Sequence, residues 1–172
     1  VAMRTRDGFM AWSLGEPEAP EAELVRRFFE GIERFSPTLV SWNGSGFDLP
    51  VLHYRALRHR LQAHRYWEMG DEDQAFRWNN YVSRFHWRHV DLMDVLAGFQ
   101  GRGRVGLDKM AQLLGLPGKL GLSGEGVWDA WLAGGVPSRR TARLRTRPTW
   151  RGASPWRRLL LSVFPRDRSR TT

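Results

Sequence analysis

The chain has 172 residues, a formal net charge of +9, 41% hydrophobic residues and no cysteine. This length is enough for one domain with a hydrophobic core, and the absence of cysteine excludes disulfides, thiol catalysis and thiolate metal sites. No apolar run approaches the roughly 18 to 20 residues that span a bilayer, and no secretory signal opens the chain, so we expect a cytoplasmic protein without a membrane partner.

The positive charge is concentrated at one end of the chain. Residues 137–172 hold eleven Arg and one acid, Asp167, whereas residues 1–136 hold 16 basic and 17 acidic residues. Because the first 136 residues are nearly neutral, the high net charge gives no evidence about the function of that part. We expect a domain over residues 1–136 and a separate arginine-rich tail over residues 137–172.

The first 35 residues predict a hairpin followed by a helix. Residues 1–5 and 9–14 are strand-like runs separated by an Asp-Gly turn, which is a good hairpin signal. Residues 21–34 have the spacing of an amphipathic helix, which we expect to cover the sheet as a scaffold element. The face expected to be buried consists of four apolar residues: Leu24, Phe28, Ile32 and Phe35.

The central stretch predicts a strand, a turn and a helix in direct succession. Residues 38–42 are expected to form a buried strand, and Asn43-Gly44-Ser45-Gly46 is the strongest turn signal in the chain. Pro50 lies near the first turn of the helix that follows, where its missing N–H is no loss. Asp48 therefore lies at a strand-to-helix junction. Because the helix dipole alone favours an acid there, these residues also allow a purely structural role for Asp48.

A second strand and helix are predicted at residues 85–91 and 92–99. Asp91 is then at a cap position and Asp94 in the first turn. Asp91 has two possible roles, capping this helix or supporting a metal site. Residues 107–114 predict a further amphipathic helix.

The segment before this strand is a long polar loop, residues 68–80, with aromatic residues in and beside it. These aromatic rings have two possible roles, stacking on single-stranded bases or pinning the loop to the core. The four residues concerned are Trp67, Phe76, Trp78 and Tyr81.

The segment Ser41-Trp-Asn-x-x-x-Phe-Asp-Leu-Pro-x-Leu52 carries a family resemblance, through the spacing from Asn43 to Asp48, Phe47 before the acid and Leu49-Pro50 after it. It resembles the second exonuclease motif of the DnaQ-like 3'-5' exonucleases, particularly the predicted exonucleases related to the proofreading domain of family B DNA polymerases. The resemblance covers about residues 8 to 135 and then stops. It extends through Trp12-Ser-Leu-Gly-Glu, Trp78-Asn-Asn-Tyr81, His89-Val-Asp-Leu-Met-Asp-Val-Leu96 and Pro117-Gly-Lys-Leu-Gly121.

This resemblance implies a ribonuclease H-like α/β fold, in which helices flank a mixed sheet. It also implies hydrolysis of phosphodiester bonds at the 3' ends of DNA or RNA, single-stranded in our expectation, with two Mg²⁺ or Mn²⁺ ions. It assigns Asp48 as a catalytic residue and metal ligand, and Trp42, Asn43 and Phe47 as nucleic-acid-binding residues. The related exonucleases also carry an acid that is similar to Asp91, which makes Asp91 a further candidate metal ligand.

The other acids that the resemblance implies have no match in the chain. The family has an Asp-x-Glu pair on a central first strand and a late-helix Asp that lies four residues after a Tyr or His. Neither pattern is present, and no Tyr or His follows residue 120. We therefore expect a fragment of an exonuclease that lacks its central first strand and is inactive as written.

The tail at residues 137–172 has three possible explanations. It is a disordered segment, a basic nucleic-acid-binding tail, or the product of a reading-frame shift near residue 136. We favour the frame shift because the family resemblance ends at the same place. The alternative functions are a non-catalytic nucleic-acid-binding protein that uses this tail and a small α/β interaction domain in which Asp48 only starts a helix. The sequence does not determine the oligomeric state.

Overall fold

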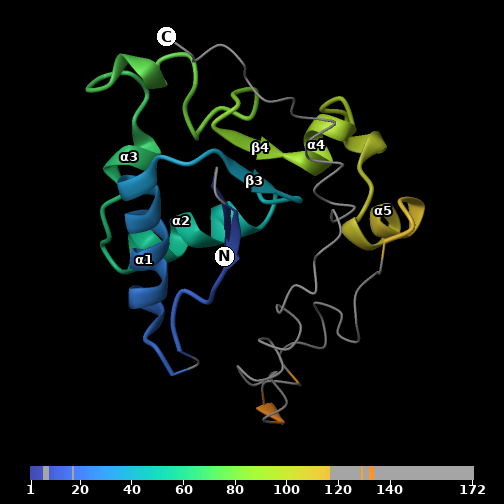
Figure 1. The fold of residues 1–172 in the computed structure, drawn as a ribbon. Helices are drawn as coiled ribbons and strands as arrows, with labels where there is room; N and C mark the ends of the chain where they lie inside the picture. The colour runs from blue at the N-terminus through green and yellow to red at the C-terminus, as the bar shows by residue number, and fades with distance from the viewer. Residues whose placement is uncertain (6–7, 17, 117–128, 130–131, 134–172) are drawn as a thin grey trace. The chain divides into compact units, whose positions relative to one another are not determined.

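The computed structural model describes residues 1–5, 8–16, 18–116, 129 and 132–133 (Figure 1). The chain divides into two units, residues 1–107 and 108–172, and each is described by itself. The predicted tail and the family-like segment Pro117-Gly-Lys-Leu-Gly121 lie outside the described residues, so the domain boundary near 136 stays a prediction. Among the residues described, no helix is both long and apolar enough to cross a membrane.

The first unit begins with the predicted hairpin. Strands β1 (Ala2–Arg4) and β2 (Phe9–Ala11) pair antiparallel, with Ala2 opposite Ala11. These two strands form a sheet of their own. The hairpin prediction is confirmed.

Two strands far apart in the sequence form the second sheet. Strand β3 (Leu39–Ser41) pairs parallel with β4 (His89–Asp91), and Ser41 lies opposite Asp91. The prediction of a buried strand at 38–42 is wrong for Val40, which is 50% exposed, because successive side chains point to opposite faces of a strand and Leu39, on the other face, packs against the core. Within the described residues β3 has a strand neighbour on one edge only. Strand β4 is shorter than the predicted 85–91 because residues 83–86 form a hydrogen-bonded turn.

Three helices pack together in this unit: α1 (Glu21–Phe35), α2 (Asp48–Arg58) and α3 (His64–Trp67), with α1 contacting both others (Figure 1). Ile32 is buried as predicted and Phe28 packs against the core, but Phe35 is 50% exposed while Val25 and Phe29 are buried, so the buried face of α1 is shifted from the predicted one. Ser36 in the left-handed region ends α1 directly after Phe35. The core consists of Val25, Phe29, Ile32, Leu49, Ala56, Ala63, Tyr66, Phe76 and Tyr81.

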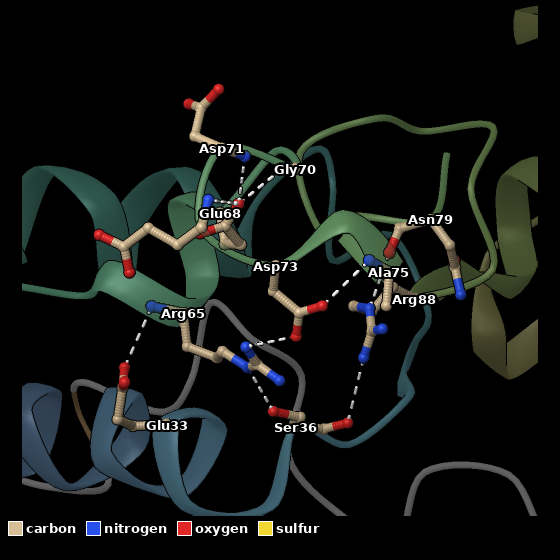
Figure 2. A network of polar contacts seen from close by, with 11 residues as sticks. Glu33, Ser36, Arg65, Glu68, Gly70, Asp71, Asp73, Ala75, Asn79 and Arg88 are labelled. Carbon is tan, nitrogen blue, oxygen red and sulfur yellow. Dashed lines mark hydrogen bonds and ion pairs between the residues drawn. The ribbon is translucent and has the colours of Figure 1, made fainter. Parts of the chain in front are cut away.

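The loop after α3 is fastened to the core through Phe76, which is fully buried in a 3₁₀ turn at Gln74–Phe76. The guanidinium carbons of Arg65 and Arg88 lie 4.3 and 3.8 Å from the centre of its ring. Figure 2 shows both arginines binding Ser36, through its hydroxyl and its carbonyl oxygen, and Arg65 pairing with Asp73 at 2.8 Å. The pinning role is thus confirmed for Phe76.

Helix α4 (Leu92–Leu96) follows β4 directly and is shorter than the predicted 92–99. Gly98 and Phe99 both have positive φ, 57° and 59°, which ends the helix. A 3₁₀ turn at Gly101–Gly103 follows. Helix α5 (Leu107–Leu113) confirms the helix predicted there and lies almost wholly in the second unit.

Candidate functional site

The candidate site lies where the parallel strands β3 and β4 end. The chain leaves β3 through residues 42–47 and enters α2 at Asp48, and it leaves β4 directly into α4. In open α/β sheets, ligands bind outside the carboxyl ends of parallel strands. The structure therefore places the predicted residues Trp42, Asn43 and Phe47 in the loop where a ligand is expected.

Asp91 holds this loop in place. Its side chain is buried, and its Oδ1 accepts hydrogen bonds from the backbone N–H groups of Asn43 at 2.8 Å and Met93 at 3.2 Å. Its Oδ2 accepts from the N–H of Ser45 at 3.0 Å. One carboxylate thus caps α4 and fixes the loop after β3, so the capping role predicted for Asp91 is confirmed.

These contacts also set the protonation of Asp91. Burial raises the pKa of its carboxyl group, but the N–H groups of Ser45, Asn43 and Met93 outweigh burial and hold the pKa below its ordinary value of 3.8. Asp91 is therefore ionised at neutral pH, and the loop is bound by charge-assisted hydrogen bonds.

The turn itself requires the residues found there. Asn43 has a φ of 61°, a conformation that asparagine tolerates better than most residues. A Cβ atom on Gly44 would lie 2.3 Å from the Ser41 hydroxyl oxygen, so only glycine fits without displacing Ser41. That hydroxyl lies 2.8 Å from Nε2 of His89, so this pair joins the last residue of β3 to the first residue of β4.

His89 is almost fully buried between these elements, with 4% of its surface exposed. Burial lowers the pKa of its imidazole, and the nearby carboxylates of Asp91 and Asp94 offset this only in part. The ring is therefore neutral at pH 7. Its hydrogen bond to Ser41 was not foreseen from the sequence, in which the two residues are 48 positions apart.

Asp48 is exposed and is the first residue of α2. Among the described residues, no three His, Asp or Glu side chains lie close enough together to hold a metal ion. Asp91 already accepts three backbone hydrogen bonds. The described residues therefore do not fit a site for two metal ions, and the metal-binding roles of Asp48 and Asp91 stay predictions.

The two aromatic residues of the loop differ in exposure. Phe47, the residue before α2, is 64% exposed and presents its ring to solvent. Trp42 is partly buried, and its indole N–H donates to the carbonyl oxygen of Val105 at 3.2 Å. Phe47 is thus the more accessible surface for a ligand.

A charged cluster that the sequence analysis missed lies next to this site. Asp94 is buried, and its two carboxylate oxygens pair with Arg84 at 2.8 Å and Arg104 at 2.5 Å. The side chains of these arginines are 43% and 38% exposed. No spacing signal marks the cluster, because each arginine is ten residues from Asp94 and lies in an irregular segment.

The fold is mixed α/β, and its glycine-rich loop leads an acid into a helix at the carboxyl end of a parallel strand, the position where open α/β sheets generally bind ligands. Residues 1–140 match the family described as predicted 3'-5' exonucleases related to the exonuclease domain of PolB. The chain belongs to this family, as the resemblance predicted.

A curated relative is the protein named DNA polymerase 1 from Sulfurisphaera ohwakuensis. It is 47% identical over 38 residues, which are 22% of this chain and 4% of that protein. The matched segment is therefore only a small part of the relative's length. No solved structure matches the chain significantly.

Proposed function

We propose that this chain carries the motif-bearing, strand-binding part of a metal-dependent 3'-5' exonuclease, which hydrolyses phosphodiester bonds at the 3' ends of DNA or RNA. The observation that supports the proposal is the position of Asp48, exposed at the start of α2 directly after the loop at the strand ends. In this proposal Asp48 is a metal ligand.

Trp42, Asn43 and Phe47 contact the substrate strand in this proposal. Phe47 supplies an exposed ring on which a base stacks, a contact that suits single-stranded substrates of any sequence. Asn43 and Trp42 are held by the bonds to Asp91 and Val105, so they form a preorganised surface beside that ring. Preorganised contacts cost little ordering entropy when a strand binds.

Mg²⁺ or Mn²⁺ would supply the activated water and the charge stabilisation for such hydrolysis. Two hard cations need several converging carboxylates, whereas no such group surrounds Asp48 within the part of the chain that the structure describes. We therefore propose that the chain as it stands binds a strand without cleaving it.

We also propose that the two small sheets belong to one ribonuclease H-like mixed sheet whose central first strand is not among the described residues. The second edge of β3, which has no strand neighbour in the described part, supports this placement. The half-exposed Val40 supports it too, because a strand in the middle of such a sheet is normally buried on both faces.

The test combines cleavage and binding. Single-stranded DNA and RNA oligomers with a 5' fluorophore are incubated with the full chain and with Asp48→Asn in Mn²⁺, and length is read on a sequencing gel. We expect neither protein to shorten the oligomers. Metal-dependent shortening by the wild type that Asp48→Asn abolishes would establish an active exonuclease and refute the proposed inactivity.

Binding is measured by fluorescence anisotropy on the same oligomers. Loss of a stacked base costs about tenfold in affinity, so we expect that effect for Phe47→Ala. Tyr54→Ala is the matched control, because Tyr54 is 72% exposed on the same helix but lies outside the loop. Equal affinities for the two variants would contradict strand binding at the loop.

A further inference from the structure

A cavity of about 180 Å³ lies beside β4 and α4, separate from the loop at residues 42–47. Aromatic and aliphatic side chains dominate its walls, which include Phe85, Trp87, Val95 and Phe99. The rings of Phe85 and Phe99 lie 5.0 Å apart at an angle of 57°. The family match covers these residues, but none of the predicted site residues lines the cavity.

The cavity is suited to one planar ring. An apolar cavity of about 150 Å³ is large enough to bind benzene, so the volume at this site admits a single aromatic ring system. Phe85 is 66% exposed and Trp87 is 60% exposed, so both rings are accessible from solvent. Exposed aromatic rings offer stacking surfaces to the bases of single-stranded nucleic acids.

The surroundings favour an anionic ligand. Arg84 lines the cavity, and its guanidinium carbon lies 5.6 Å from the ring centres of both Phe85 and Phe99. Arg84 and Arg104 share the single carboxylate of Asp94, which leaves one net positive charge in the cluster. Both guanidiniums are about two-fifths exposed, so their remaining N–H groups can reach a phosphate.

From this combination we infer that the cavity binds one base of a single-stranded nucleic acid, with the adjoining phosphate on Arg84 and Arg104. The base stacks on Phe85 and Trp87 while the phosphate completes the charge balance of the Arg84–Asp94–Arg104 cluster. The identification of the ligand as a nucleic acid rests on the proposed function, whereas the existence of the cavity does not depend on it.

The position of the cavity relates it to the candidate site. His89 lines the cavity, and the same imidazole is bonded to Ser41 at the start of the loop. The cavity and the loop are therefore linked through the His89–Ser41 pair, within the first unit. In this inference, the cavity is a second contact for a nucleotide of the strand that binds at the loop.

The experiment measures the preference for bases over a bare backbone. The full chain is titrated, in EDTA and 150 mM salt, with a fluorescent ten-nucleotide oligothymidylate and with an abasic oligomer of the same length. Contacts to phosphate alone, including any from the arginine-rich tail, do not distinguish these probes. We expect the wild type to bind oligothymidylate more tightly than the abasic strand.

Two substitutions address the cavity, Phe85→Ala and Trp87→Ala, and both rings are exposed enough for removal without loss of the fold. Each is expected to reduce the preference by about tenfold, the usual effect of one lost stacking contact. Trp78→Ala is the matched control, since Trp78 is 81% exposed and does not line the cavity. Circular dichroism verifies the fold of each variant.

The outcomes separate this inference from the proposed function. A preference that falls with Phe85→Ala and Trp87→Ala, but not with Trp78→Ala, supports the cavity. An unchanged preference in both cavity variants refutes it, even if Phe47→Ala weakens binding, and so does a wild type that binds the two probes equally. A preference lost only in Trp78→Ala would place base stacking on the loop at residues 68–80 and would also overturn the inference.

Discussion

Two buried aspartates three residues apart organise two neighbouring regions in different ways. Asp91 accepts backbone N–H groups from the loop after β3 and from α4, together with a hydrogen bond from the Ser45 side chain. Asp94 accepts only from arginine side chains, which come from irregular segments on either side of α4. The comparison shows that two buried carboxylates can support different parts of the structure. The first carboxylate fixes main chain, whereas the second holds partly exposed, charged side chains.

The largest expected effect follows from removing Asp91. Asp91→Ala leaves three backbone N–H groups without their acceptor and removes the cap of α4, so we expect the free energy of unfolding to fall by about 2 to 4 kcal/mol. Urea denaturation followed by far-ultraviolet circular dichroism measures this change. A loss below about 0.5 kcal/mol would mean that water replaces the carboxylate and that the loop does not depend on Asp91.

A smaller effect is expected at Asp94. Asp94→Asn keeps the size of the side chain, and the two arginines that lose their partner are partly exposed, so no charge is left buried. We therefore expect the free energy of unfolding to fall by about 1 kcal/mol. Because the arginines face solvent, this loss should shrink between 0.05 and 0.5 M NaCl, while the loss for Asp91→Ala should not. The same denaturation curves at the two salt concentrations test both statements. Identical salt dependence for the two variants would remove the distinction between the regions.

The smallest expected effect is on how the free energy of unfolding depends on pH in acid. The pKa of Asp91 is lower in the folded chain than its ordinary value of 3.8, so its ionisation contributes stability that is complete above that value and is lost as pH falls through the lowered pKa. The effect is small because burial opposes the N–H groups. In Asp91→Asn, unfolding free energy should therefore depend less on pH below about 4 than in the wild type. An equal or steeper acid dependence in Asp91→Asn would contradict this assignment.

The sequence predicted the strand, turn and helix around Asp48 because local signals specify them. Asn43 and Gly44 favour the turn, and Pro50 is compatible with the first helical turn. The helix after Asp91 was predicted for the same reason, since an aspartate at that position is a cap signal. These features depend on residues that are neighbours in the chain.

The sequence could not predict contacts that depend on tertiary packing. The bond between Ser41 and His89 and the pairing of Asp94 with two arginines join segments that no period or spacing connects. The buried face of α1 was mispredicted because Val25 and Phe29 are selected by the helices that pack against α1, not by the helical period alone. The cavity between Phe85 and Phe99 likewise exists only after the 83–86 turn and α4 meet.

The ring of Phe76, enclosed by two guanidiniums, has a consequence for sequence change in this protein. A leucine at this position fills much of the same volume but offers no π-electron density to Arg65 and Arg88. A lysine in place of either arginine loses the flat face that rests on the ring. Accepted replacements at positions 65, 76 and 88 should therefore occur together rather than one at a time, and a random-mutagenesis library selected for folding would show them as linked triples.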